Sequence, residues 1–289
     1  MANEKKQFTH FKIHTQYSIC EGAIKIADLA KYCKENKVKS IGLNDSFNLC
    51  GALEFSEDIS KVGTQPIIGT QINFKFKNLI GKIPIFAKTE KGFNNLTKLS
   101  SKSYLDVEQS MPPHCDLNDL LSNNEDLIIT SGGLDSFFNK LVQKNNEIEI
   151  DEFISKISSS FVDRFYFEIQ RHNDNGEKTF EFILLNLSKK FKIPLIASQE
   201  VFYIEKDMFE AHDALLCIGE KTYVDEQNRK KYSDQHYLKK DDELEKVYKD
   251  IPEALENNYN FPLRFSYKLK KNPPNLPSIK ISSSLSENE

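Results

Sequence analysis

Several features that would identify a function are missing from this chain of 289 residues. Its five cysteines are scattered and never form a Cys-x-x-Cys pair, which argues against a disulfide framework and a thiolate zinc site. No apolar run approaches the length needed to cross a bilayer, and the polar residues 2–7 are not followed by an apolar signal region. We therefore expect a cytoplasmic protein with reduced thiols and no membrane partner.

The usual motifs for nucleotide binding and for nucleophilic catalysis are also absent. The chain has no Gly-x-x-x-x-Gly-Lys-Ser/Thr phosphate loop and no Gly-x-Gly-x-x-Gly fingerprint. Ser131 precedes two glycines but lies outside a Gly-x-Ser-x-Gly frame, so it is a weak nucleophile candidate. A formal net charge of −4 gives no overall attraction to nucleic acid.

The composition is that of a soluble globular protein, with 39% hydrophobic and 28% charged residues. Short β-rich runs alternate with stretches of helical periodicity. Strands are predicted at 8–14, 39–45, 66–74, 83–88, 126–131, 165–170 and 193–198, and helices near 24–36, 51–60, 91–103, 135–143, 149–158 and 176–191. This order favours an α/β fold, a distorted seven-stranded (β/α) barrel, with a broad doubly wound sheet as the alternative.

Two regions depart from the β/α alternation. The segment between Phe74 and Ile83 is too short for a crossover helix, and residues 78–81 are typical of a turn. We therefore expect a β-hairpin insertion there. After Asp207 the pattern turns helical, and it does so again at 241–260, which predicts a helical C-terminal extension.

The domain organisation follows from these patterns. We expect a flexible N-terminus over 1–7 and one domain over 8–270. Residues 271–289 are rich in Pro and Ser and are predicted to be a linker. We expect this linker to lead into a longer chain.

Polar residues on the first predicted strand suggest metal chemistry. His10, Lys12 and His14 alternate, so they are predicted to project from one face of the strand. Two imidazoles can bind a transition metal, whereas a protonated ammonium is not a ligand and repels a cation. The strand is therefore typical of a metal-site scaffold in which one ligand has been replaced. Lys12 is expected to form an ion pair with Asp45 or Glu200.

Other candidate ligands lie at the carboxyl ends of predicted strands, where the functional groups of such barrels gather. His14, Asp45 and His172 occupy three of these ends and could converge. A two- or three-metal hydrolase needs several more carboxylates and imidazoles, but other strand ends carry residues such as Gln71. Structural roles are open alternatives: a strand-end histidine can simply be hydrogen-bonded, and Asp45 could cap the helix near Cys50.

The ordered segments of the chain resemble the PHP (polymerase and histidinol phosphatase) domain family. Over residues 8–277 the chain is similar, more narrowly, to the PHP domain at the N-terminus of the alpha (catalytic) subunit of bacterial DNA polymerase III. The segments that carry the resemblance are Phe-Thr-His with His-Thr-Gln-Tyr-Ser (8–18), Ile-Gly-Leu-Asn-Asp (41–45), Pro-Ile-Ile-Gly (66–69), Gly-Phe-Asn-Asn-Leu (92–96), Ile-Thr-Ser-Gly-Gly (129–133), Phe-Tyr-Phe-Glu-Ile-Gln (165–170), Ala-His-Asp-Ala-Leu-Leu-Cys-Ile (211–218) and 237–257.

Compared with metal-bound members of this family, most ligand positions differ, and only His14, Asp45 and His172 match. The differences are Lys12 for the first His of His-x-His, Ser46 for the His of Asp-His, Gln71 for a Glu, Lys82 for a His, Glu200 and Phe202 for the Asp and His of Asp-x-His, and Glu21 for an Asp. The resemblance therefore implies a degenerate domain that holds no metal or other cofactor. All these positions would be vestigial, and none would be catalytic.

The resemblance also implies a role within a larger protein. This domain would be a structural and docking module for a separate epsilon-type proofreading exonuclease subunit. The rest of the polymerase chain would contact primer–template DNA and use Mg²⁺ for nucleotidyl transfer. Two alternatives are an active metal-dependent PHP phosphoesterase or 3′–5′ exonuclease and a free-standing small-molecule phosphatase. The substitutions at the ligand positions weigh against both.

Overall fold

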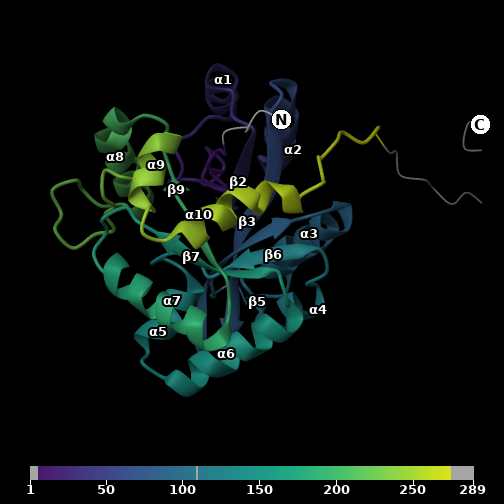
Figure 1. Cartoon of the computed structure of the whole chain (residues 1–289), viewed down its shortest axis with the longest axis vertical. Helices are drawn as coiled ribbons and strands as arrows, with labels where there is room; N and C mark the ends of the chain where they lie inside the picture. Colours follow the sequence, from purple (N-terminus) through teal and green to yellow (C-terminus); the bar gives the residue numbers. More distant parts are fainter. Residues whose placement is uncertain (1–5, 109, 275–289) are drawn as a thin grey trace, which may run out of the picture.

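The structure, a computed structural model, describes residues 6–108 and 110–274. Most of the predicted flexible N-terminus and of the predicted linker lies outside these residues. A strongly curved sheet occupies the centre of the molecule and helices surround it (Figure 1). Among the described residues, no helix combines the length and the apolar character that a membrane crossing requires.

The sheet is a nearly closed barrel. Its hydrogen-bonded order is β8-β7-β6-β4-β3-β2-β1-β9. β8 and β9 lie at the two ends of this order, but only Gln199 separates them along the chain. The backbone itself therefore joins the two ends of the sheet, and we count β8 and β9 as one interrupted strand. This confirms the predicted seven-stranded barrel. The strands are β1 (Lys12–Ile13), β2 (Ser40–Ser46), β3 (Gln65–Phe76), β4 (Leu79–Ala87), β6 (Leu127–Thr130), β7 (Phe165–Gln170), β8 (Leu195–Ser198) and β9 (Glu200–Val201); β5 (Cys115–Asp116) pairs with β3 outside this path.

Helices follow the strands much as the periodicity predicts. Figure 1 shows α1 and α2 at one side of the barrel and α5, α6 and α7 grouped at the opposite side. The helices of the barrel are α1 (Ile26–Asn36), α2 (Ala52–Lys61), α3 (Glu90–Leu105), α4 (Leu117–Ser122), α5 (Phe137–Gln143), α6 (Glu147–Ser160) and α7 (Glu177–Phe191). The predicted C-terminal helical extension contains η1 (Lys206–Met208), α8 (Phe209–Glu220), α9 (Asp241–Val247), α10 (Pro252–Asn260) and η2 (Phe261–Arg264).

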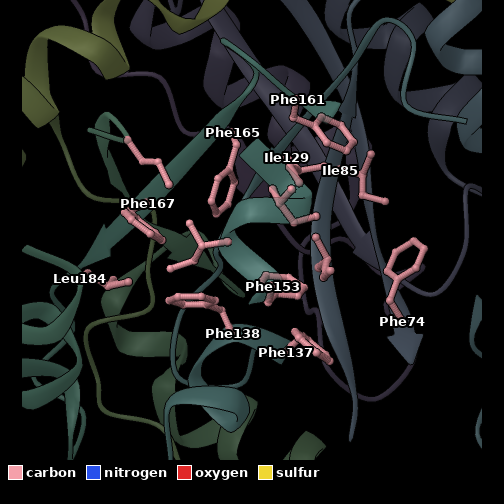
Figure 2. Packing of buried hydrophobic residues seen from close by; sticks show 14 of the residues in the cluster. Phe74, Ile85, Ile129, Phe137, Phe138, Phe153, Phe161, Phe165, Phe167 and Leu184 are labelled. Atoms are coloured by element: carbon pink, nitrogen blue, oxygen red, sulfur yellow. The ribbon is translucent and has the colours of Figure 1, made fainter. Parts of the chain in front are cut away.

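The outer faces of the strands pack against these helices. On β7, Phe165 and Phe167 alternate with polar or inward residues and join a large buried cluster with Phe138 and Phe153 (Figure 2). The rings of Phe138 and Phe167 lie 5.4 Å apart between centroids. Side-chain alternation on the strands thus separates an apolar outer layer from the barrel interior.

The hairpin insertion is formed by β3 and β4, which pair antiparallel with Phe76 opposite Leu79. The predicted turn at 78–81 is wrong, because the turn consists of Lys77 and Asn78. Gly81 is needed for another reason. A Cβ at this position would lie 2.7 Å from the Cα of Phe137, so glycine permits the close approach of α5 to the hairpin.

The C-terminal extension closes the amino-terminal end of the barrel. Phe261 and Phe265 enter an apolar cluster formed by inward residues of the strands. The ring of Phe261 contacts those of Phe11 (4.6 Å) and Phe86 (5.6 Å between centroids). We call this cluster the apolar half of the interior; its members are Phe11, Ile67, Phe86, Ile128, Tyr166, Ile196, Phe261 and Phe265.

The first strand is shorter than predicted, and its side chains do not alternate simply. β1 covers only Lys12 and Ile13. Phe11 points into the apolar half, next to the inward Lys12, and His10 donates from Nε2 to the carbonyl of Lys239 at 2.9 Å. The expectation that His10 shares a face with Lys12 and His14 is therefore wrong.

Candidate functional site: a cluster of lysines and carboxylates

Lys12 lies at the centre of the carboxyl half of the barrel interior. Its Nζ atom is 3.2 Å from Glu168 Oε1 and 3.4 Å from Glu200 Oε2. The side chain of Lys12 is 2% exposed, and those of Glu168 and Glu200 are 0% and 8% exposed. Of the two partners predicted for Lys12, Glu200 is confirmed and Asp45 is wrong. Buried charges are tolerated only when they are paired, and here one ammonium lies between two carboxylates.

Glu168 is held by neighbours on its own side of the barrel. Thr130 donates from Oγ1 to Glu168 Oε2 at 2.5 Å, and Gln170 donates to Oε1. The backbone amide of Glu168 donates to Ser131 Oγ at 2.9 Å. Ser131 therefore serves β7, as an acceptor, and the structure gives it no imidazole or carboxylate partner among the described residues.

His14, Gln71 and Glu200 meet beside Lys12. His14 Nε2 lies 2.9 Å from Glu200 Oε1, and Gln71 Nε2 donates to the same oxygen at 3.1 Å. Gln71 Nε2 is also 3.1 Å from His14 Nε2. Burial raises the pKa of Glu200, but the ammonium of Lys12 and the contact with His14 bring that pKa well below its usual range. Glu200 is consequently a buried anion that contacts a cation and two polar side chains.

A second charged group lies toward the carboxyl-terminal mouth of the barrel. Lys82 Nζ is 3.2 Å from Glu21 Oε1 and 3.6 Å from Asp135 Oδ2, while Lys230 Nζ is 2.6 Å from Asp135 Oδ2. Burial raises the pKa of Glu21, but Lys82 and the neighbouring cations outweigh burial and lower it to about 2. Burial lowers the pKa of Lys82, and its carboxylate neighbours more than reverse that effect.

Asp45 lies near His14 but faces other donors. Its carboxylate accepts from the amide of Thr15 at 2.6 Å, from Thr15 Oγ1 at 2.7 Å and from Ser18 Oγ at 2.7 Å. Ser18 Oγ in turn accepts from the amide of Ser46 at 3.1 Å and lies 3.2 Å from His14 Nδ1. Burial raises the pKa of Asp45, and these hydrogen bonds oppose the rise. Asp45 thus fixes the loop after β1, and the proposed cap of the helix near Cys50 is wrong: α2 begins at Ala52, after Gly51.

His172 belongs to a hydrogen-bonded group at the rim. Its Nε2 accepts from the amide of Glu200 at 3.1 Å, and its Nδ1 donates to Glu177 Oε1 at 2.8 Å. One ligand atom each from His172, Asp174 and His236 lies within 4.8 Å of the others, so these three residues are candidate metal ligands. However, the two imidazoles stack at 3.9 Å with an angle of 6° between their planes. A metal bonds along a nitrogen lone pair in the ring plane, so one ion cannot lie in both planes.

Phe202 covers the imidazole of His14. Its ring centroid is 4.7 Å from that of His14 and 4.8 Å from that of Tyr232. Phe202 is fully buried and offers no ligand atom. At this position His14 therefore has an aromatic neighbour that brings no ligand atom.

Seven predicted site positions thus contribute side chains to one buried cluster: Lys12, His14, Glu21, Gln71, Lys82, Glu200 and Phe202. Ser46 lies beside Glu21 and helps to lower its pKa, whereas Asp45 and His172 bind other partners. Prediction from the sequence missed three members of that cluster: Glu168, Asp135 and Lys230. Glu168 could have been found, because it alternates with Tyr166 and Gln170 on a strand whose other face is apolar. Asp135 and Lys230 come from irregular segments, and no periodic pattern marks them.

The ammonium and carboxylate groups of this cluster are paired with one another. Ammonium groups of Lys12, Lys82 and Lys230 face carboxylates of Glu21, Asp135, Glu168 and Glu200. Each of these carboxylates contacts at least one ammonium group, and that contact offsets the cost of withdrawing its charge from water.

A barrel with one hairpin and polar groups gathered at the carboxyl ends of its strands defines a (β/α)-barrel protein whose buried charged cluster lies where such barrels usually carry their active site. The family model of the PHP domain matches residues 10–172, and the chain belongs to this family.

The chain is similar over almost its whole length to subunits of a polymerase. It is 33% identical over 287 residues to DNA polymerase III subunit alpha of Caulobacter vibrioides. This match covers 96% of this chain and 25% of that protein. The subunit of Rickettsia conorii is 34% identical, with 95% and 23% covered, and that of Haemophilus influenzae is 29% identical, with 96% and 24% covered. The chain spans about a quarter of the length of these relatives.

Solved structures give weaker likenesses. An amidohydrolase from Chromobacterium violaceum, with bound sulfate and no metal, has a TM-score of 0.45 and 8% identity, covering 72% of this chain and 96% of that one. A two-domain protein from Bacteroides vulgatus, described as containing a predicted PHP-like metal-dependent phosphoesterase, has a TM-score of 0.44 and 11% identity, covering 88% and 63%. Membership of the family therefore rests on the family model.

Proposed function

We propose that this chain is the PHP domain of a replicative DNA polymerase, the alpha subunit of DNA polymerase III, and that the domain is a metal-free structural and docking module. The similarity to alpha subunits over about 95% of the chain supports the parent's identity. Primer extension, primer–template DNA and Mg²⁺ then belong to the remainder of the polymerase chain. A separate epsilon-type proofreading exonuclease is the docking partner, and the complex is cytoplasmic.

One observation carries the metal-free part of this proposal: the ammonium of Lys12 lies between Glu168 and Glu200, with distances of 3.2 and 3.4 Å. A divalent ion bound by the same carboxylates needs oxygen atoms at about 2.0–2.2 Å, so the ion and the ammonium compete for one space. Lys82 repeats this arrangement beside Glu21 and Asp135. The remaining family positions offer an amide at Gln71 and a hydrocarbon ring at Phe202, which bind metals poorly or not at all.

The grouping of His172, Asp174 and His236 favours the alternative, an active metal-dependent phosphoesterase or 3′–5′ exonuclease. The stacking of the imidazoles of His172 and His236 opposes a metal site there. Each ring nitrogen of these two residues also already has a polar contact within the chain. His236 Nδ1 contacts the carbonyl of Glu200 at 3.0 Å and its Nε2 contacts Asp174 at 2.7 Å. These contacts support a structural role for the group.

Metal analysis of the purified chain tests the metal-free role. After incubation with Mn²⁺ or Zn²⁺ and removal of free metal, we expect far less than one bound ion per chain. Lys12→His should not change this, because Gln71, Lys82 and Phe202 still replace ligands. Lys190→His, at an exposed lysine that pairs with Asp151, is the matched control. Stoichiometric metal in the natural chain or in Lys12→His contradicts the proposal.

The parent's identity is tested separately by reading the coding frame beyond Glu289. A continuing frame that encodes a polymerase region with clustered aspartates supports the proposal. A stop codon at that point contradicts it and favours a free-standing phosphatase.

A further inference from the structure

A segment without regular secondary structure lies across the open end of the barrel. It comprises residues 229–236, Arg-Lys-Lys-Tyr-Ser-Asp-Gln-His, and follows α8. At its start Arg229 forms two hydrogen bonds of 2.6 Å with the two carboxylate oxygens of Asp213 on α8. Arg229 also donates to the carbonyl of Val224. The side chain of Arg229 is 3% exposed, so this pair is a buried anchor for the segment.

The next residue, Lys230, lies at the mouth of the barrel, where its side chain is 33% exposed. Its Nζ is 2.6 Å from Asp135 Oδ2, on the loop after β6, and 3.9 Å from Glu21 Oε1, on the loop after β1. Its backbone amide donates to Glu220 at 3.2 Å. Lys230 therefore connects two loops at the mouth of the barrel, and it adds a third ammonium to those of Lys12 and Lys82.

Tyr232 and His236 cover the inner aromatic groups. The ring of Tyr232 stacks on Phe202 at 4.8 Å, and its hydroxyl donates to Asp135 at 3.4 Å. His236 stacks on His172, and its backbone carbonyl accepts from the amide of Phe202 at 3.0 Å.

The middle of the segment is bound to the loop after β7. The amide of Ser233 donates to Asp174 Oδ1 at 2.7 Å, and Ser233 Oγ donates to the carbonyl of His172 at 2.5 Å. The segment is thus tied to α8 at one end and to the ends of β7 and β9 at the other. Irregular chain that makes this many buried polar contacts differs from an ordinary exposed loop.

We propose that residues 229–236 form a lid over the carboxyl end of the barrel and supply Lys230 as a third, partly exposed cation at its mouth. This proposal rests on the metal-free role proposed above. It adds a second barrier, because the lid covers the charged cluster independently of the ligands that have been replaced. Reintroducing family ligands at Lys12 or Phe202 would therefore leave the charged cluster inaccessible until the lid opens.

Hydrogen–deuterium exchange of the whole chain tests the lid. In the natural chain, amides of 229–236 should exchange at least about tenfold more slowly than those of the exposed segment 222–228, because closed segments exchange only when they open. Arg229→Met should raise exchange over 229–236 by about tenfold or more, since it removes the anchor to Asp213. Lys190→Met, which breaks a surface ion pair with Asp151, should leave it unchanged.

Equal exchange rates for 229–236 and 222–228 in the natural chain overturn the proposal, and so does an unchanged rate in Arg229→Met. If circular dichroism shows that Arg229→Met does not fold, the natural chain and Lys230→Met decide, with faster lid exchange expected in Lys230→Met. Metal content measured on the same samples separates the two proposals. Stoichiometric metal beneath a protected lid refutes the metal-free role alone, whereas rapid lid exchange without metal refutes the lid alone.

Discussion

The two halves of the barrel interior are built from the same strands but hold together in different ways. Toward the amino end, β7 contributes Tyr166 to an aromatic and aliphatic cluster; two residues later it contributes Glu168 to the charged cluster. β8 contributes Ile196, and β9, just beyond it, contributes Glu200. On the antiparallel β4 the order is reversed, with Lys82 in the charged cluster and Phe86 in the apolar half. Within two to four residues of one strand, the interior thus changes from hydrocarbon to charge.

The two halves of the interior therefore owe their stability to different interactions. In the apolar half, burial is favourable for each side chain whatever its neighbours are. In the charged half, desolvation opposes every residue, and only a correctly placed partner compensates. We therefore expect the charged half to be sensitive to the loss of a single partner and to pH, and the apolar half to be sensitive only to the loss of volume.

Lys12→Met tests most directly whether the charged half depends on its buried cation. It removes the ammonium between Glu168 and Glu200 while preserving most of the side-chain volume, and leaves two buried carboxylates without that cation. We expect the free energy of unfolding at pH 7 to fall by about 4 kcal/mol. Because Lys12 helps hold the pKa of Glu200 low, the loss should shrink as the pH falls below about 4.3, where unfolded glutamate is protonated.

Urea unfolding at pH 7 and at pH 4 measures this effect. Lys190→Met is the control, because its exposed ion pair with Asp151 should contribute less than about 1 kcal/mol. A stability of Lys12→Met equal to that of the natural chain at pH 7 would mean that the charged half does not depend on its cation.

Phe261→Ala makes the complementary change in the apolar half. Its fully buried ring contacts Phe11, Phe86 and Tyr166, so the substitution leaves a cavity at the amino-terminal end of the barrel. We expect a loss of about 3 kcal/mol. Because the contacts are between rings, the loss should be the same at pH 4 and pH 7.

Thermal and urea unfolding at both pH values check the prediction for Phe261. Leu263→Ala is the matched control in the same short helix, because Leu263 is 82% exposed and should change stability by less than about 0.5 kcal/mol. A loss that varies with pH in Phe261→Ala would erase the distinction between the two halves.

The outer layer of the barrel was readily predictable from the sequence, and the two interior halves were less so. Helical stripes and β-rich runs have a fixed period, and β7 was predicted at its observed bounds, 165–170. The hairpin was also predictable, but its turn was not, because Gly81 serves the approach of α5 and the chain turns at Lys77. A glycine indicates that some constraint exists without showing which one.

The partners within the charged cluster were only partly predictable. Lys12 and Glu200 stood out because the family resemblance predicted that they replace metal ligands. Asp135 and Lys230 come from irregular segments 95 residues apart. Their meeting depends on how α8 and the segment after it fold back over the barrel, and no local periodicity records that. The packing of Phe261 in the apolar half escaped prediction for the same reason, because Phe261 contacts Phe11 across 250 positions of the chain.

Glu21→Gln should cause the smallest loss of stability of the three substitutions. It tests whether an ion pair near the mouth of the charged half contributes less than the fully buried pairs of Lys12. Glu21 pairs with Lys82 near the mouth, where its side chain is 14% exposed, so solvent screens it more than it screens Glu168. We expect a loss of about 2 kcal/mol at pH 6, less than that for Lys12→Met. The folded pKa of about 2 lies below that of an unfolded glutamate. The contribution of Glu21 to the free energy of unfolding is therefore complete above about pH 4.5 and disappears as the pH falls toward 2.

Unfolding measured from pH 6 to pH 2.5 should show the stability curves of Glu21→Gln and the natural chain converging at low pH. Glu125→Gln, at an exposed pair with Lys91, should follow the natural chain throughout. Parallel curves for Glu21→Gln would show that the ion pair at the mouth stabilises the barrel through packing and not through charge.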